Sequence, residues 1–378
     1  MEIKEIKYDK INIEGLPLQI IKRDILQRQE IVLSWQDIEC VENKIIDFLN
    51  HFDIPLFRCE NTIQFLFPIT ALKILAAKSK ILWPDDEKLA LSIDAIIKSH
   101  CIIWKAGRFT FDITDKPLVY GILNVTPDSF YDGGQYYAPE DMKKHIANMV
   151  DSGADIIEVG GQTTKPGGYV EVKPEEEIMR TIPAIKFIHD KYPNIAIAID
   201  TYKLPVMQAA IEAGVDIIND VRAFDSYQKR ALMAKSDVGL VTMHSSREHE
   251  YDNLSDEMIK FFKDNLKTLI DAGIDLNRII LDQGIGYAKV ADGYQDYTMM
   301  RNLDQLNKFN RPIMVAISRK GFGKKLFNLN KEDRLPVTLI AESAMFLRGG
   351  RVIRAHDIAE TYQLVNMLDI INQSYWFR

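Results

Sequence analysis

Eight short apolar runs between residues 119 and 357 each lead to a charged or hydrogen-bonding residue. These residues are the part of the chain best suited to chemistry: Asn124, Asp200, Asn219, Asp220, His244, Asp282, Lys320, Arg354 and His356. Carboxylates and amides accept N–H donors, whereas lysine and arginine bind anions. The pattern predicts the mouth of an active site.

The runs themselves predict the elements that position these residues. They are rich in Val, Ile and Leu and cover 119–125, 155–161, 195–200, 215–220, 238–244, 278–284, 312–318 and 351–357. Strands buried on both faces have continuous apolar runs, and the segments between these runs have helical spacing. Eight such units in about 255 residues predict an α/β fold, a (β/α)8 TIM barrel, with its chemistry at the carboxyl ends of the strands.

A second unit is predicted before the barrel. Residues 1–100 are expected to form a small α/β or α+β accessory domain of unknown role, with a strand at 60–68 and helices at 70–79 and 83–100. Residues 101–114 contain two β-rich runs around a glycine, which predicts a β-hairpin that plugs the N-terminal end of the barrel. The barrel is expected over 116–372, within a domain of residues 101–378.

Composition argues against several functional classes. A net charge of −7 argues against general binding to nucleic acids or anionic membranes. No run approaches the roughly 20 apolar residues of a membrane span, and the first residues do not resemble a signal peptide. The three cysteines match neither a zinc pattern nor a disulfide framework. We therefore expect a cytoplasmic protein that holds an anionic substrate through local basic groups.

The loop after the first predicted strand is the most specific motif. Residues 121–134 (GILNVTPDSFYDGG) leave the strand at Asn124 and continue through Asp128 and Asp132. A shorter segment would suffice as a connection, and Phe130 is unusual in a loop that is merely solvated. The loop is therefore predicted to be functional.

This loop resembles the first-loop signature of dihydropteroate synthase, a pterin-binding TIM-barrel enzyme of folate biosynthesis. Six further motifs follow in the order of that family, so that the resemblance covers 101–372: GGQTTKPGG (160–168), AIDTYK (198–203), IIND (217–220), LDQGIGYAK (281–289), SRKGF (318–322) and RAHD (354–357). The resemblance implies a transferase that condenses 6-hydroxymethyl-7,8-dihydropterin diphosphate with p-aminobenzoate. The products would be 7,8-dihydropteroate and pyrophosphate. It also implies a homodimer and a target of sulfonamides.

The resemblance assigns pterin binding to Asp200, Asn219, Asp282 and Lys320. A pterin edge carries amino and ring N–H donors, and each buried donor left unpaired would cost about 1–3 kcal/mol. Carboxylates and an amide can accept those donors, while Lys320 can face the acceptor side of the ring. Helix N-capping is the alternative role for Asp200 and Asp220. For His244, packing and site contact are left equally open.

The resemblance also implies a site for the pyrophosphate leaving group. Arg354 and His356 lie two residues apart on the last strand, so that they share a face next to the start of a helix. Asn124 resembles the family residue that helps to place Mg²⁺, which binds a few oxygen ligands and retains waters. Arg319 and Arg351 rank below Arg354 and His356 as phosphate ligands, and the alternative interpretation of them is as surface charges.

By analogy with the family, the reaction is an SN1-like substitution through a resonance-stabilised pterin methylene cation. Asp132 is the candidate carboxylate that faces this cation, and Asp128 and Lys320 complete the catalytic candidates. The first and second loops would fold over the mouth and exclude water.

The predicted p-aminobenzoate site departs from the family pattern. Its candidates are Thr164, Lys165, Pro166, Phe130, Tyr287 and Gly321. The family usually has arginine at Lys165 and serine at Gly321, and lysine lacks the planar fork of donors of arginine. The usual Asp-Pro-Gly after the sixth strand is Asp282-Gln283-Gly284 here. An altered response to sulfonamides is therefore predicted.

Two other functions remain open from the sequence. A pterin-dependent methyltransferase would share the pterin carboxylates, but it would not need Arg354, His356 or the first-loop motif. A catalytically silent pterin-binding regulatory protein is favoured only by the altered amine side.

Overall fold

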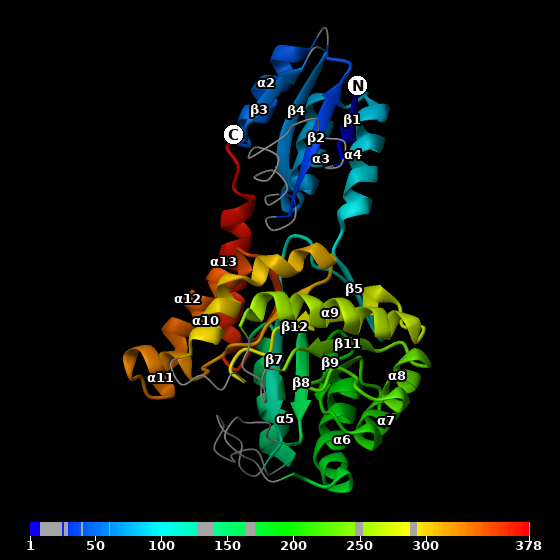
Figure 1. Ribbon diagram of the computed structural model, residues 1–378, viewed down its shortest axis with the longest axis vertical. Coiled ribbons are helices and arrows are strands. Elements are labelled where there is room, and N and C mark those ends of the chain that lie inside the picture. The colour runs from blue at the N-terminus through cyan, green and yellow to red at the C-terminus, as the bar shows by residue number, and fades with distance from the viewer. Residues whose placement is uncertain are drawn as a thin grey trace. The chain divides into compact units, whose positions relative to one another are not determined.

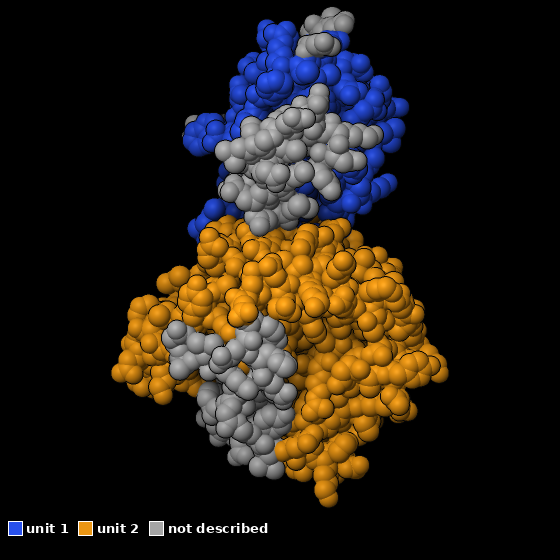
Figure 2. All heavy atoms as spheres, in the orientation of Figure 1, with its two compact units in different colours: residues 1–102, 366–378 blue, residues 103–365 orange. Residues whose placement is uncertain are grey.

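The chain divides into two compact units (Figure 2). One comprises Met1–Ile102 together with Asn366–Arg378, and the other comprises Ile103–Val365. The structure is a computed structural model that describes residues 1–7, 25, 29–38, 41–59, 61–126, 139–162, 171–245, 252–287 and 293–377.

The second unit is built on a closed barrel of eight parallel strands (Figure 1). They are β7 (Leu118–Asn124), β8 (Ile156–Gly160), β9 (Ala196–Asp200), β10 (Ile217–Asp220), β11 (Gly239–Met243), β12 (Ile279–Asp282), β13 (Ile313–Val315) and β14 (Gly350–Ala355). Each strand pairs with its neighbours in the sequence, and β14 pairs with β7 to close the ring. The predicted (β/α)8 barrel is confirmed.

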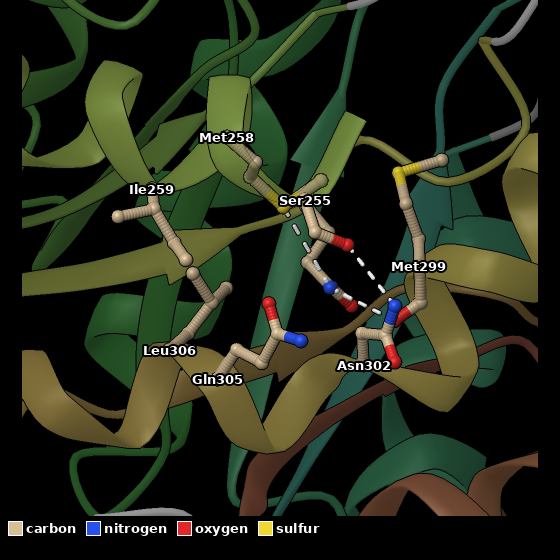
Figure 3. A pocket seen from close by; sticks show the side chains of 8 residues that line it. Ser255, Met258, Ile259, Met299, Asn302, Gln305 and Leu306 are labelled. Atoms are coloured by element: carbon tan, nitrogen blue, oxygen red, sulfur yellow. Dashed lines mark hydrogen bonds between the residues drawn. The ribbon is translucent and has the colours of Figure 1, made fainter. Parts of the chain in front are cut away.

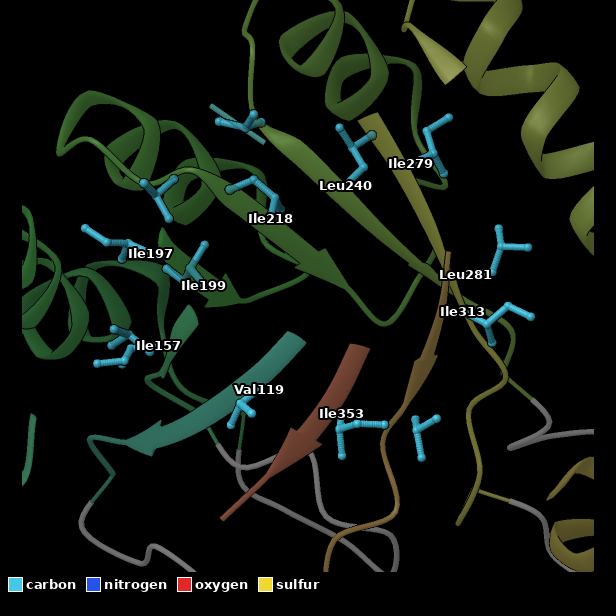
Figure 4. Packing of buried hydrophobic residues seen from close by; sticks show 14 of the residues in the cluster. Val119, Ile157, Ile197, Ile199, Ile218, Leu240, Ile279, Leu281, Ile313 and Ile353 are labelled. Carbon is cyan, nitrogen blue, oxygen red and sulfur yellow. The ribbon is translucent and has the colours of Figure 1, made fainter. Parts of the chain in front are cut away.

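Helices follow every strand and cover the outside of the barrel. They are α5 (Pro139–Asp151), α6 (Pro174–Lys191), α7 (Leu204–Glu212), α8 (Tyr227–Ala234), α9 (Leu254–Asp271), α10 (Tyr294–Arg301), α11 (Phe322–Phe327), α12 (Leu335–Phe346) and α13 (Ile358–Gln373), with 3-10 turns η3 (Leu276–Arg278), η4 (Leu303–Phe309) and η5 (Glu332–Arg334). Alternate strand residues such as Ile157, Ile199 and Leu281 pack in the layer between strands and helices (Figure 4). Because side chains alternate along a strand, the intervening residues point into the barrel.

A hairpin of β5 (Ile103–Ala106) and β6 (Phe109–Asp112) contacts the residues that precede several barrel strands. Trp104 Nε1 donates to the Arg278 carbonyl at 3.0 Å, and Arg311 Nη2 donates to the Ile103 carbonyl at 2.8 Å. The Arg108 guanidinium binds both carboxylate oxygens of Asp216, at 2.9 and 2.8 Å. The hairpin therefore plugs the amino ends of the strands, as predicted, and leaves the carboxyl ends for function.

The first unit has a four-stranded antiparallel sheet in the order β1-β2-β4-β3. Its elements are β1 (Glu2–Glu5), β2 (Glu30–Gln36), α2 (Glu42–Asn50), β3 (Leu56–Cys59), β4 (Thr62–Pro68), η2 (Ile69–Ala71), α3 (Leu72–Leu82) and α4 (Glu87–His100). The helices at 70–79 and 83–100 and the strand at 60–68 correspond to α3, α4 and β4. The short strands β1 and β3 have no clear sequence signal.

The segment Asn366–Arg378 clusters with the first unit, although the sequence predicted residues up to 378 in the barrel domain. The ring of Phe377 lies 4.9 Å from the ring of Phe52 and 5.8 Å from that of Phe48, and Tyr375 lies 5.0 Å from Phe52. Aromatic packing of this kind is a tertiary contact that helical periodicity does not reveal. Among the described helices, none has the length and apolar character needed to span a bilayer.

Candidate active site at the carboxyl ends of the barrel strands

A buried network around Glu158 connects five strands inside the barrel. Glu158 on β8 accepts hydrogen bonds from Tyr120 Oη and Asn219 Nδ2, both at 2.8 Å, through the same carboxylate oxygen. Its other oxygen accepts from Arg354 Nε at 2.7 Å and also from Arg354 Nη2. Arg354 Nη2 further donates to Asp200 Oδ2 at 3.2 Å. The network holds two of the predicted pterin residues and Arg354 in one place.

Two buried acceptor atoms at this network have no partner. Asp200 and Asn219 are register partners on the paired strands β9 and β10. Asp200 Oδ1 and Asn219 Oδ1 are both buried and accept no hydrogen bond in the part of the chain that the structure describes. Because a buried polar atom without a partner is costly, such atoms indicate a ligand. A ligand with two adjacent N–H donors would satisfy both.

The electrostatics of the network follow from burial and close charges. Burial and the neighbouring Glu158 carboxylate raise the pKa of Asp200 to about 7, against the opposing effect of Arg354. Burial alone would lower the pKa of Arg354, but Glu158 and Asp200 raise it above its ordinary value. Arg354 therefore stays charged, while Asp200 can change its protonation state near neutral pH.

Asp200 does not cap the helix that follows it. The N-cap of α7 is Lys203, which makes no side-chain capping bond. The alternative role considered for Asp200 is therefore absent, and its carboxylate faces the barrel interior with Arg354.

Lys320 and Asp282 lie on the opposite side of the mouth. Lys320 Nζ donates to the Ile285 carbonyl and lies 5.2 Å from the centre of the Tyr287 ring. Gly286 has a φ of +93°, and a Cβ there would lie 2.9 Å from Lys320 Cδ, so that glycine lets the lysine pass close to the backbone. Burial lowers the pKa of Lys320 to about 8, although Asp282 raises it, and burial also raises the pKa of Asp282. These residues form a second polar wall of the site.

His356 and Asn124 lie at the ends of the adjacent strands β14 and β7. The backbone N–H of His356 donates to Ser318 Oγ at 3.2 Å. Burial and the charge of Arg354 lower the pKa of His356 to about 3, so that its ring is neutral at pH 7. The Asn124 amide oxygen lies against Gly160, where a Cβ would approach it to 3.2 Å.

Asp220 and His244 make contacts with the helices on the outside of the barrel. Asp220 points outward, where it accepts from the backbone N–H groups of Arg222 and Phe224 and pairs with Lys229 Nζ at 2.9 Å. His244 follows β11, and its ring packs edge-on against Phe261 at 5.1 Å. The period of two along a strand explains both, since the inward neighbours are Asn219 and Met243.

Arg319, Arg351 and Gln283 lie in other surroundings than the sequence predicted. The interpretation of Arg319 and Arg351 as surface charges is wrong, because both are buried. Gln283 points away from the mouth and donates to the Met299 carbonyl at 3.0 Å. It lines a small cavity among α9, α10 and η4 together with Met258 and Met299 (Figure 3). Gln283 therefore does not belong to the amine side of the site.

Comparisons with known proteins agree with this geometry. The pterin binding enzyme family matches residues 120–356, which is more than half of the chain. The dihydropteroate synthase of Clostridium beijerinckii is 38% identical over 269 residues, which cover 71% of this chain and 98% of that protein.

The chain belongs to the pterin-binding enzyme family.

Solved structures of this family share the barrel. The Yersinia pestis dihydropteroate synthase, crystallised with a sulfonamide drug, aligns with a TM-score of 0.68 and 29% identity over 72% of this chain and all of that one. The Xanthomonas albilineans dihydropteroate synthase with 4-aminobenzoic acid aligns with a TM-score of 0.65 and 31% identity, over 70% of this chain and 96% of that one.

Several residues predicted from the resemblance to the pterin-binding family lie outside the described residues. They are Asp128, Phe130 and Asp132 of the first loop and Thr164, Lys165 and Pro166 of the second loop. Within the described residues, Asn219 and Arg354 both bind Glu158, Arg354 also binds Asp200, and Lys320 contacts Tyr287. Gly321 is at the N-cap of α11, with open space where a side chain would be.

Glu158 and Tyr120 were missed in the sequence analysis. Both lie in the middle of strands that are otherwise apolar. A carboxylate in a strand buried on both faces must be paired, so Glu158 itself was a usable signal. Its partners could not be named in advance, because Arg354 is 196 residues away in the chain.

Proposed function

We infer that this chain catalyses the dihydropteroate synthase reaction, a step of folate biosynthesis. It condenses 6-hydroxymethyl-7,8-dihydropterin diphosphate with p-aminobenzoate and releases pyrophosphate. The observation that carries this inference is the pair of buried acceptors, Asp200 Oδ1 and Asn219 Oδ1, which have no partner among the described residues. Membership of the pterin-binding family supports a pterin as the ligand whose N–H donors these acceptors would bind.

The pterin residues have complementary roles. Asp200 and Asn219 accept N–H donors of the ring, and Asp282 accepts from the ring across the mouth. Lys320 faces the acceptor side of the ring. When the C–O bond breaks, the electron pair leaves with pyrophosphate, and the buried carboxylates stabilise the positive charge that develops on the pterin methylene group. The amine nitrogen then forms the new C–N bond and loses a proton.

Pyrophosphate is held next to the ring. Arg354 and His356 are the proposed contacts, with His356 as a neutral donor. The Asn124 amide oxygen fits Mg²⁺ that arrives with the diphosphate, because Mg²⁺ retains waters and takes few protein oxygens. The described residues contain no cluster of three or more His, Cys, Asp or Glu that could hold a metal by itself. The ion would neutralise charge on the leaving group.

The amine substrate occupies the outer part of the mouth. The proposed contacts are Thr164, Lys165, Pro166, Phe130, Tyr287 and Gly321, and Asp128 and Asp132 complete the catalytic set. Support comes from the 4-aminobenzoic acid bound to the Xanthomonas albilineans relative. The rate of pyrophosphate release should therefore depend on the presence of both p-aminobenzoate and the pterin diphosphate.

A steady-state assay tests this function. Pyrophosphate release is measured with Mg²⁺ and with each substrate alone or both together. Asp200→Asn and Asn219→Leu should each lower kcat/KM for the pterin diphosphate by roughly tenfold or more. The first substitution removes the charge of the acceptor at position 200, and the second removes the amide acceptor at position 219. An unmodified chain that binds the pterin diphosphate in calorimetry but never turns it over would instead identify a silent pterin-binding protein.

We further propose a cytoplasmic homodimer in which residues 1–100 form an accessory domain. Large apolar side chains are exposed on α11, on α12 and directly after α12, among them Phe327, Ile340 and Leu347. Exposed apolar side chains that gather on neighbouring helices favour a protein interface. Light scattering coupled to size exclusion would give twice the chain mass for a dimer, and Ile340→Glu should shift it to the monomer.

A further inference from the structure

Arg319 lies in the turn after β13 and is buried against the turn after β14. Its φ of +50° is in the left-handed region, which arginine rarely adopts. Its Nε and Nη2 donate to the two carboxylate oxygens of Asp357, at 2.8 and 2.7 Å. Its Nη1 donates to the carbonyls of Lys331 and Glu332, at 3.1 and 2.7 Å. All three guanidinium nitrogens are thus bound in a fixed plane.

The backbone of Arg319 is fixed as well. Its N–H donates to Thr338 Oγ1 on α12 at 3.1 Å, and its carbonyl accepts from Arg334 Nη1 at 3.2 Å. Because the backbone of Arg319 is held in place, the directions of its own side chain and of the next one, Lys320, are fixed as well. Its own side chain points to Asp357, while that of the next residue, Lys320, reaches the Ile285 carbonyl at the mouth.

The pair joins two turns that the barrel sheet does not join. β13 and β14 pair only from Ile313 to Val315, with an irregularity in the register between Ile313 and Met314. Lys320 and His356 lie beyond the last paired residues, Val315 and Ile353. Above that point the links between the two turns include the hydrogen bond from the His356 N–H to Ser318 Oγ and the Arg319–Asp357 ion pair. The Arg319–Asp357 pair joins the immediate neighbours of Lys320 and His356.

We propose that Arg319 is a positioning residue that fixes the Lys320 cation relative to the diphosphate anchor at Arg354 and His356, an inference that rests on the proposed function. Its guanidinium acts through Asp357 and touches no substrate. A planar fork is needed for this geometry, and the single ammonium group of lysine cannot bind both Asp357 oxygens and two carbonyls at once. The pair therefore sets the spacing between the two halves of one substrate, its pterin ring and its diphosphate.

The test compares Arg319→Lys and Asp357→Asn with the unmodified chain. Binding of inorganic pyrophosphate with Mg²⁺ is measured by isothermal titration calorimetry, which does not depend on turnover. We expect at least tenfold weaker pyrophosphate binding and a similar rise in KM for the pterin diphosphate, with a smaller change in KM for p-aminobenzoate. The double variant should be little worse than either single one, because each breaks the same pair.

The chain offers a control of the same chemistry at the other end of the barrel. Arg108 makes a bidentate pair with Asp216 in the hairpin that plugs the amino ends of the strands. Arg108→Lys should change stability but leave pyrophosphate affinity and both KM values within twofold. If Arg319→Lys does not fold, as judged by circular dichroism, the pyrophosphate affinity and KM of Asp357→Asn test the proposal instead.

Pyrophosphate affinity and KM that are unchanged in a folded Arg319→Lys or Asp357→Asn variant would overturn the proposal. An equal loss of affinity in Arg108→Lys would also overturn it, because the effect would then be one of general stability. Turnover by the unmodified chain is measured separately, so that failure of the proposed function is distinguished from failure of this inference.

Discussion

At the residue scale, the charge of Glu158 controls both halves of the site. It binds Arg354 and Asn219, and its proximity contributes to the raised pKa of Asp200. Ionised Asp200 is the better acceptor for the N–H donors of a pterin. The pKa values of about 7 for Asp200 and about 8 for Lys320 therefore predict a narrow bell-shaped pH dependence of kcat/KM.

Glu158→Gln should move the acidic limb of this profile to lower pH. The substitution removes the negative charge of Glu158 that lies near Asp200. Arg354 then has Asp200 as its remaining carboxylate partner in this network. Both changes lower the pKa of Asp200. The buried Arg354 also loses a partner, which should cost roughly 3–5 kcal/mol of stability. The measurement is kcat/KM for the pterin diphosphate between pH 5 and 9, with the exposed Glu212→Gln on α7 as the control. An acidic limb that stays near pH 7 would contradict this account.

Gly321→Ser should strengthen binding of p-aminobenzoate and change sulfonamide affinity. Gly321 has a φ of −67°, and no atom lies within 4 Å of the place where a Cβ would be, so that serine fits without strain. A hydrogen bond from its hydroxyl to a carboxylate would be worth about 1.5–3 kcal/mol, roughly tenfold or more in affinity. Titration with p-aminobenzoate and a sulfonamide checks this. The exposed Ala90→Ser on α4 is the control, and affinities equal to that control would refute the assignment of Gly321.

At the element scale, the β5–β6 hairpin contributes to stability and not to chemistry. A Cβ at Gly239 would lie 2.8 Å from Ala106 Cβ and 3.0 Å from Trp104 Nε1. Gly239→Ala should therefore lower the free energy of unfolding by about 1–3 kcal/mol through overpacking. Urea unfolding measures this loss, and KM for both substrates should stay unchanged. A large rise in either KM would show that the hairpin influences the mouth.

At the scale of the whole molecule, Glu342 should make stability depend on pH. Burial, together with the charge of Asp357, raises the pKa of Glu342 from 4.5 to about 8, and neither of its carboxylate oxygens has a partner among the described residues. Between pH 4.5 and about 8 the folded chain keeps a proton that the unfolded chain has lost. The free energy of unfolding should therefore fall as the pH rises through this window.

Glu342→Gln keeps the shape and removes the ionisable group. It should be more stable than the unmodified chain at pH 8, by a few kcal/mol as an order of magnitude, and nearly equal to it at pH 4.5. Urea unfolding at several pH values gives the difference, with Glu212→Gln again as the exposed control. Parallel stability curves for Glu342→Gln and the unmodified chain would show that Glu342 ionises normally.

Local patterns in the sequence determined the barrel and the strand ends. Continuous apolar runs define strands buried on both faces, and Asp200, Asn219 and Asp282 were recognised as polar residues at the carboxyl ends of those strands. The hairpin was visible from its glycine turn. These features depend on neighbours in the chain, and a single sequence contains that information.

Only the tertiary structure decided which charges meet. Glu158 binds Arg354 across 196 positions of the chain, and Arg319 is buried on Asp357 although its neighbours are polar. The aromatic C-terminal segment likewise packs with the first unit through ring contacts between residues far apart in the chain. Such pairs are selected by the closure of the barrel and by the cost of leaving a buried charge unpaired, and neither is a property of local sequence.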